Sequence, residues 1–136
     1  MQYRRLQAWV LCAVGLVEIL AFGAVVMPLE WMNAGHEWLG LGDLSQAPAV
    51  EAVMRQVSFS YGLHGIALLL IATDVARYRP LVVLSGVGYL AYGAVFLLTD
   101  IVLGMPRLWV IGNGGSTLLV GAILLGLVCA DSRRSW

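Results

Sequence analysis

Residues 6–27 read LQAWVLCAVGLVEILAFGAVVM, and this run contains a single charged residue, Glu18. A helix needs about 20 mostly apolar residues to cross a bilayer, so the run is long enough to span one. Arg4 and Arg5 precede it, as basic residues precede the apolar region of a signal peptide. The run is too long for such a region, however, and it carries a glutamate. We therefore predict a first membrane-spanning helix rather than a cleaved leader.

Three further apolar runs follow, at about residues 50–76, 80–103 and 108–130. Of the 136 residues, 60% are hydrophobic and 12% are charged. A soluble domain of this length would need far more polar surface, and four spans leave little room for one. We therefore predict an all-α fold, an integral membrane four-helix bundle that forms one domain over residues 1–136.

The longest connection, between the first two spans, has a helical pattern of its own. Glu30, Asn33 and Glu37 fall on one face of a helix, and Trp31 and Trp38 lie around the rest. Tryptophan is enriched where a bilayer meets water. We predict a short helix in the membrane interface at this position.

All eight basic residues are arginines, and their placement predicts the orientation of the spans. Cytoplasmic loops carry an excess of basic residues. With four spans, Arg55 and Arg107 fall on one side of the membrane, and six arginines fall on the other: Arg4, Arg5, Arg77, Arg79, Arg133 and Arg134. We therefore predict that both termini are cytoplasmic. The net charge of zero gives no indication of a nucleic-acid partner.

Two ionisable residues lie near the middle of predicted spans, Glu18 in the first and His64 in the second. Because these spans run antiparallel and each residue rises about 1.5 Å, the two side chains lie at similar depth. Charged groups at this depth usually face the bundle interior and have a partner. In a functional interpretation they form a proton-linked or ligand-binding site lined by Tyr61, Tyr89 and Tyr92. In a structural interpretation, which we favour, they form a buried hydrogen-bonded pair that fixes helix register.

A second cluster of polar residues lies near the predicted outer end of the spans. Glu51 precedes Arg55 by four residues, the favourable order for an ion pair on one helix, and Asp100 could reach the same arginine. A functional interpretation makes this an anion or headgroup site. We favour a structural one, in which the arginine reaches toward the surface and ties the loop down.

Metal and haem sites are poorly supported. His36 and Glu37 in the outer connection lack a metal-ligand spacing, and His36 and His64 lie at different depths, unlike a bis-histidine haem pair. Cys12 and Cys129 form no C-x-x-C motif and are expected to be apolar fillers. We predict no metal and no cofactor. Ala122 and Gly126 form a small-xxx-small pair that is available to a partner helix.

Four segments of the chain resemble a group of uncharacterised small bacterial four-helix membrane proteins: HEWLGLG at 36–42, YGLHG at 61–65, DVARYRP at 74–80 and GMP at 104–106. The chain is also similar to DoxX-like proteins in architecture, that is, in size and number of helices. The resemblance implies a membrane location and no particular activity. We predict that this membrane is the bacterial inner (cytoplasmic) membrane.

Three functional hypotheses follow. The first is a non-enzymatic membrane protein, an accessory subunit of a larger membrane complex or a homo-oligomer, with the lipid bilayer as its surroundings. The second is a binder or transporter of a small apolar or weakly acidic molecule, such as a quinone or lipid, through Glu18 and His64. The third and weakest is a membrane redox enzyme, since the chain has no paired cysteines and poor haem ligands.

Overall fold

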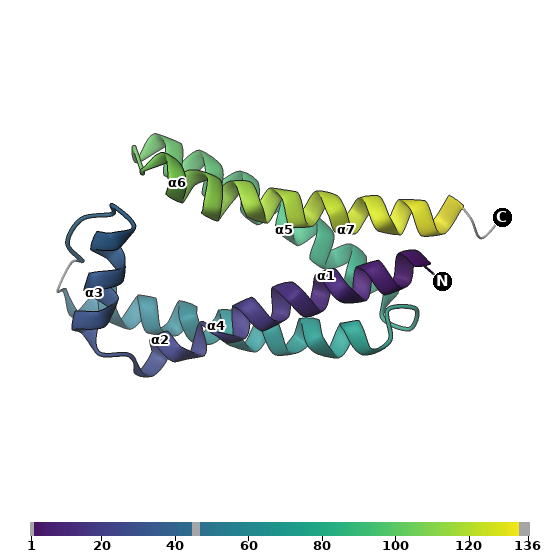
Figure 1. Cartoon of the computed structure of the whole chain (residues 1–136), viewed down its shortest axis with the longest axis horizontal. Helices are drawn as coiled ribbons and strands as arrows, with labels where there is room; N and C mark the ends of the chain where they lie inside the picture. The colour runs from purple at the N-terminus through teal and green to yellow at the C-terminus, as the bar shows by residue number, and fades with distance from the viewer. Residues whose placement is uncertain (1, 45–46, 134–136) are drawn as a thin grey trace. The chain divides into compact units, whose positions relative to one another are not determined.

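Helices joined by turns make up the whole of the chain described by the computed structural model, residues 2–44 and 47–133, and no strand occurs among them. Figure 1 shows their order along the chain. The predicted all-α class is confirmed. Arg134, one of the arginines that predicted the orientation, lies outside the described residues.

Four helical segments of the described chain are long and apolar enough to cross a membrane. They are Gln2–Val26, Pro48–Thr73, Arg79–Val102 and Arg107–Arg133. Their bounds differ from the predicted ones by at most four residues, as where the first segment begins at residue 2 instead of about 6. The chain thus has the helices of a multi-pass membrane protein.

The first span is interrupted, which the apolar pattern does not predict. Helix α1 (Gln2–Ile19) ends before Leu20 and Ala21, and α2 (Phe22–Val26) follows. The amide N–H of Leu20 and that of Ala21 donate to carbonyls three residues earlier, so the backbone tightens there. Pro28 then begins α3 (Leu29–Trp38), the short helix predicted between the first two spans. Gly40 ends it with φ at 74°, a conformation that favours glycine.

The chain divides into two compact units, which are described separately. Unit 2 comprises Cys12–Leu69, that is, the second half of α1, then α2 and α3, and most of α4 (Pro48–Thr73). Unit 1 comprises the described residues before Cys12 and after Leu69. The organisation of the whole chain as one domain stays a prediction.

Unit 1 is built on a helical hairpin. Helix α5 (Arg79–Val102) packs against α7 (Ser116–Arg133), and the short helix α6 (Arg107–Val110) and a π-helical turn, η1 (Ile111–Gly115), connect them. Glycine permits the close approach: a Cβ added at Gly121 would lie 2.8 Å from the carbonyl oxygen of Gly86. Small residues at such contacts are typical of helices that pack in membranes.

Unit 2 has an equivalent contact between α1 and α4. A Cβ at Gly65 would lie 2.6 Å from the carbonyl oxygen of Gly15, and a Cβ at Gly15 would lie 2.8 Å from that of Gly65. The two helices therefore touch backbone to backbone at this level. Leu68, one turn further along α4, is completely buried.

Candidate functional site

Glu18 and His64 form a hydrogen-bonded pair inside unit 2. Glu18 lies in the last turn of α1 and His64 in the middle of α4, and Oε2 of the glutamate is 2.7 Å from Nδ1 of the histidine. The glutamate side chain is 11% exposed and that of the histidine 48%. The carboxyl group is thus enclosed by protein while much of the imidazole ring remains accessible within this chain.

The glycine contact explains why the two side chains meet. A Cβ at Gly65 would lie 3.1 Å from the Cβ of Glu18, so the residue after His64 touches the glutamate directly. The close approach of the helices lets Glu18 and His64 bond directly, without a water between the groups. The pair can hold the relative register of α1 and α4, and it can also exchange a proton between a carboxyl and an imidazole group.

Aromatic rings lie one turn from this pair. Phe22, at the start of α2, covers Gly62, where an added Cβ would lie 2.6 Å from the phenylalanine ring. Its ring also packs edge-on against Phe59, with 5.6 Å between the centroids. Sequence reasoning overlooked this contact, although Phe22 and Gly62 lie close in sequence to Glu18 and His64.

The three tyrosines predicted to line the site are divided between the units. Tyr61 belongs to unit 2, three residues before His64 on α4. Tyr89 and Tyr92 belong to α5 in unit 1, where the Tyr92 ring lies 5.9 Å from that of Phe96. A site that all three tyrosines line together with Glu18 stays a prediction.

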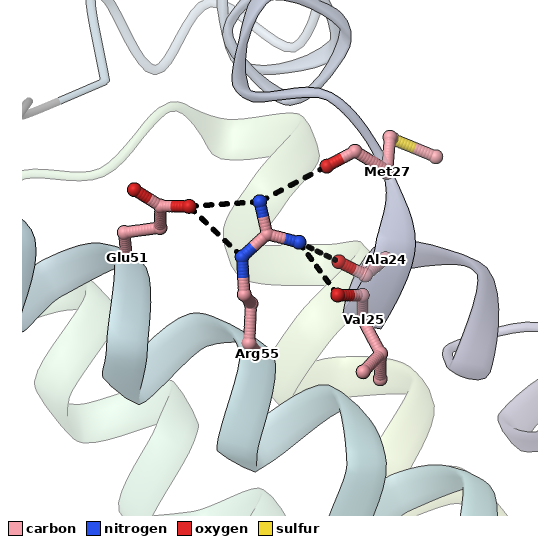
Figure 2. Close-up of polar contacts among 5 residues, drawn as sticks. All are labelled: Ala24, Val25, Met27, Glu51 and Arg55. Carbon is pink, nitrogen blue, oxygen red and sulfur yellow. Dashed lines mark hydrogen bonds and ion pairs between the residues drawn. The ribbon is translucent and has the colours of Figure 1, made fainter.

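Arg55 forms hydrogen bonds with both α4 and the end of α2, and Figure 2 shows these contacts. Its Nε and Nη2 donate to the same oxygen of Glu51, at 2.9 and 2.8 Å. On the other side of the guanidinium, Nη1 donates to the carbonyl oxygen of Val25 at 2.6 Å and Nη2 to that of Met27 at 3.1 Å. A further, longer contact at 3.4 Å reaches the carbonyl of Ala24. Arg55 therefore closes the open C-terminal end of α2.

Asp100, predicted to reach Arg55, belongs to unit 1, whereas the Glu51–Arg55 pair belongs to unit 2, and the three-residue group stays a prediction. Asp100 is only 6% exposed, and its Oδ2 accepts a hydrogen bond of 2.9 Å from Nδ2 of Asn113. Asn113 lies in η1, and its carbonyl oxygen in turn accepts a bond from the hydroxyl of Thr117. Sequence reasoning missed this pair, because its members are 13 residues apart and joined through a proline turn.

Polar contacts also gather at the end of unit 1 where α1 and α5 begin and α7 ends. Arg4 forms an ion pair with Asp131 at 2.9 Å, and Arg79 donates to the hydroxyl of Ser132. In the turn before α5, the guanidinium of Arg77 stacks on the ring of Tyr78, 5.5 Å from its centroid. This end of the unit is therefore basic and held by contacts to α7.

No group of three histidine, cysteine or acidic side chains that could hold a metal ion occurs among residues 2–44 and 47–133. Cys12 and Cys129 are free thiols. His36 lies in α3, and its Nδ1 is buried without a hydrogen-bond partner in the described chain.

The chain matches no protein-family model, no curated protein and no solved structure. The resemblance to small bacterial four-helix membrane proteins, DoxX-like in architecture, stays a hypothesis beside these results.

Proposed function

We propose that this chain is a non-enzymatic multi-pass membrane protein that acts through its helix surfaces, as an accessory subunit of a larger membrane complex or as a homo-oligomer. The observation that carries the proposal is that polar side chains in the spans form hydrogen bonds between one helical segment and another. Arg55 binds the end of α2, Asn113 binds Asp100, and Glu18 binds His64. Polar groups that bond to each other inside the spans stabilise the packing of the helices, which is a structural role.

The exposed surface of the spans supports the same role. Large apolar side chains stand out from each of the four spans, for example Leu20 at 76% exposure and Val102 at 82%. In a bilayer such surfaces meet either lipid or other helices. A small bundle whose polar groups are used internally offers its outer faces for association.

The proposed location is a bacterial inner membrane with both termini in the cytoplasm. Support comes from the basic end of unit 1, where Arg4 and Arg79 contact the end of α7 through Asp131 and Ser132. Basic residues concentrate on the cytoplasmic side of membrane proteins. The interfacial placement of α3, with Trp31 and Trp38 exposed, belongs to the opposite side in this arrangement.

The test is the mass of the assembly extracted in native lipid. The chain would be released from membranes by a lipid-solubilising copolymer, without detergent, and weighed by native mass spectrometry. We expect a defined multiple of the 14.7 kDa chain, or a constant stoichiometry with another chain. Monomers at every expression level would contradict the proposal.

The second candidate is binding of a small apolar or weakly acidic molecule, such as a quinone or lipid, at Glu18 and His64. The specific observation that favours it is the 48% exposure of the imidazole beside a nearly buried carboxyl group. An accessible imidazole at this depth could contact a small molecule that enters from the bilayer.

Its test is retention of a small molecule after gentle purification. Wild type would be compared with Glu18→Gln and His64→Ala, and with Glu30→Gln in α3 as the matched control. A molecule carried by wild type and the control but lost by both variants would favour the binding role. Equal amounts of bound small molecule in all four proteins would mean that Glu18 and His64 have a structural role and do not bind the ligand.

A further inference from the structure

A groove lies at the basic end of unit 1, lined by Tyr3 of α1 and by Gly126, Cys129, Ala130 and Arg133 of α7. We call it the end groove. Its volume, about 420 Å³, is within the range of 300–1,000 Å³ that is usual for sites of small organic ligands. Neither the Glu–His pair nor the contacts of Arg55 involve it.

The groove has an amphipathic lining that follows from helix periodicity. Its four α7 residues are spaced by three, one and three positions, so they share one face of the helix. Small side chains make the floor: a Cβ added at Gly126 would meet no atom within 4 Å. Seven residues further on, about 10 Å along the axis, Arg133 is exposed at the end of the face. The cationic group thus lies at the terminus of a shallow track of small residues.

The charge around the groove is positive. Five described arginines lie near this end of the unit, whereas the nearby acids are already engaged: Asp131 by Arg4 and Asp74 by the backbone N–H of Arg77. The five are Arg4, Arg5, Arg77, Arg79 and Arg133. Five arginines against two aspartates leave this end net positive. A net positive surface at the end of membrane spans attracts anionic lipid headgroups.

We propose that the end groove binds an anionic phospholipid, whose phosphate is held by Arg133 and whose acyl chain lies over Gly126 and Ala130. An arginine guanidinium can donate two parallel hydrogen bonds to a phosphate. A second copy of this chain fits the groove less well. Copies that share one orientation in the membrane would bring their basic ends together, and like charges there oppose association.

The experiment uses the whole chain in nanodiscs that contain equal amounts of phosphatidylglycerol and phosphatidylcholine with the same acyl chains. Native mass spectrometry measures which lipids remain bound as the protein is released. Wild type is expected to retain phosphatidylglycerol preferentially. Arg133→Gln should lower that preference about fivefold, the effect of one basic residue near an anionic surface.

A second variant tests the floor of the groove. Gly126→Leu should displace the acyl chain and reduce retention of both lipids, while the fold persists because open space surrounds position 126. The matched controls are Arg107→Gln and Gly112→Leu, at the opposite end of the last span, where a Cβ at Gly112 would also meet no atom within 4 Å. Both controls should behave as wild type.

Cys129 supplies an independent measurement, because its free thiol is exposed in the groove. In a Cys12→Ser background, a neutral maleimide should label Cys129 more slowly in phosphatidylglycerol vesicles than in phosphatidylcholine vesicles. Equal labelling rates, or an equal loss of lipid preference in Arg133→Gln and Arg107→Gln, would overturn the proposal. So would a Gly126→Leu variant that changes the number of chains in the assembly and leaves lipid retention intact.

Discussion

Position 65 shows how strictly a single residue can be constrained in this chain. The residue stands against the backbone of α1, and a Cβ there would lie 2.6 Å from the carbonyl oxygen of Gly15, which cannot move aside as a flexible side chain can. We expect Gly65→Ala to separate α1 from α4, breaking the Glu18–His64 contact, and to cost about 1–3 kcal/mol of unfolding free energy. Chemical denaturation in detergent micelles measures this cost.

The control for this prediction is Gly23→Ala in α2, where an added Cβ meets no atom within 4 Å. Alanine is the better helix former, so this change should leave stability unchanged or raise it by up to about 1 kcal/mol. If both substitutions destabilised the protein equally, close packing at Gly65 would not be the cause.

Arg55 makes a different kind of contribution, because it satisfies backbone carbonyls that α2 leaves open. Arg55→Gln should cost about 1–3 kcal/mol, since the carbonyls of Val25 and Met27 lose their donor in a partly buried place. Hydrogen exchange measured by mass spectrometry should show faster exchange over residues 20–30.

Glu51→Gln distinguishes the contribution of the ion pair from that of the bonds between Arg55 and the backbone carbonyls. It removes the charge of the partner but leaves the carbonyl contacts, so we expect a smaller loss of stability and little change in exchange over residues 20–30. An effect equal to that of Arg55→Gln would mean that the ion pair, which is 28% and 36% exposed, dominates.

The sequence predicts contacts between two side chains better than contacts between a side chain and a backbone carbonyl. The Glu51–Arg55 pair follows from their spacing of four residues on one helix. The carbonyl contacts do not, because they require the end of α2, and neither residue of the interruption, Leu20 or Ala21, is a proline or glycine. The Glu18–His64 pair could be predicted from the lengths of the two spans and their antiparallel order alone.

At the scale of elements, the π-helical turn η1 is the feature with the least support in the sequence. The Gly112–Asn113–Gly114–Gly115 run predicts close packing or a kink, and the structure uses Gly114 for packing, since a Cβ there would lie 2.6 Å from the backbone nitrogen of Leu97. The wider turn also carries Asn113, which bonds to Asp100. π-helical turns are rare and therefore hard to predict from local propensity.

The Asn113–Asp100 bond gives this element a testable role. Asn113→Ala removes the only side-chain donor described for a carboxyl group that is 6% exposed, so we expect a loss of about 1–3 kcal/mol in unfolding free energy. Ser116→Ala is the matched control, because its exposed hydroxyl donates only to backbone carbonyls of the adjacent turn η1, those of Gly112 and Asn113. If the control lost as much stability, the cause would be the helical turn rather than the Asp100 contact.

At the scale of the whole molecule, helix number and approximate bounds follow from the sequence because apolar length is a strong signal. The division into two units does not, since it cuts α1 at residue 12 and α4 at residue 70, within continuous helices. Orientation depends on how arginines are distributed over both sides of the membrane, which is a property of the complete chain.

Orientation can be tested with reporters placed after three positions. Green fluorescent protein fluoresces only if it stays in the cytoplasm, because it does not reach its fluorescent form when it is exported unfolded, whereas alkaline phosphatase is active only outside the cytoplasm. Fusions after Arg77 and Arg133 should fluoresce, and a fusion after Gly42 should show phosphatase activity, because four spans alternate and the arginine excess lies on the side of the termini.

Replacing Arg4 and Arg5 with glutamine should then weaken the bias and give mixed signals at all three positions, whereas replacing Arg107 should not. Opposite signals from the fusions at 77 and 133 would mean that the number of spans between them is odd, and the four-span arrangement would be wrong.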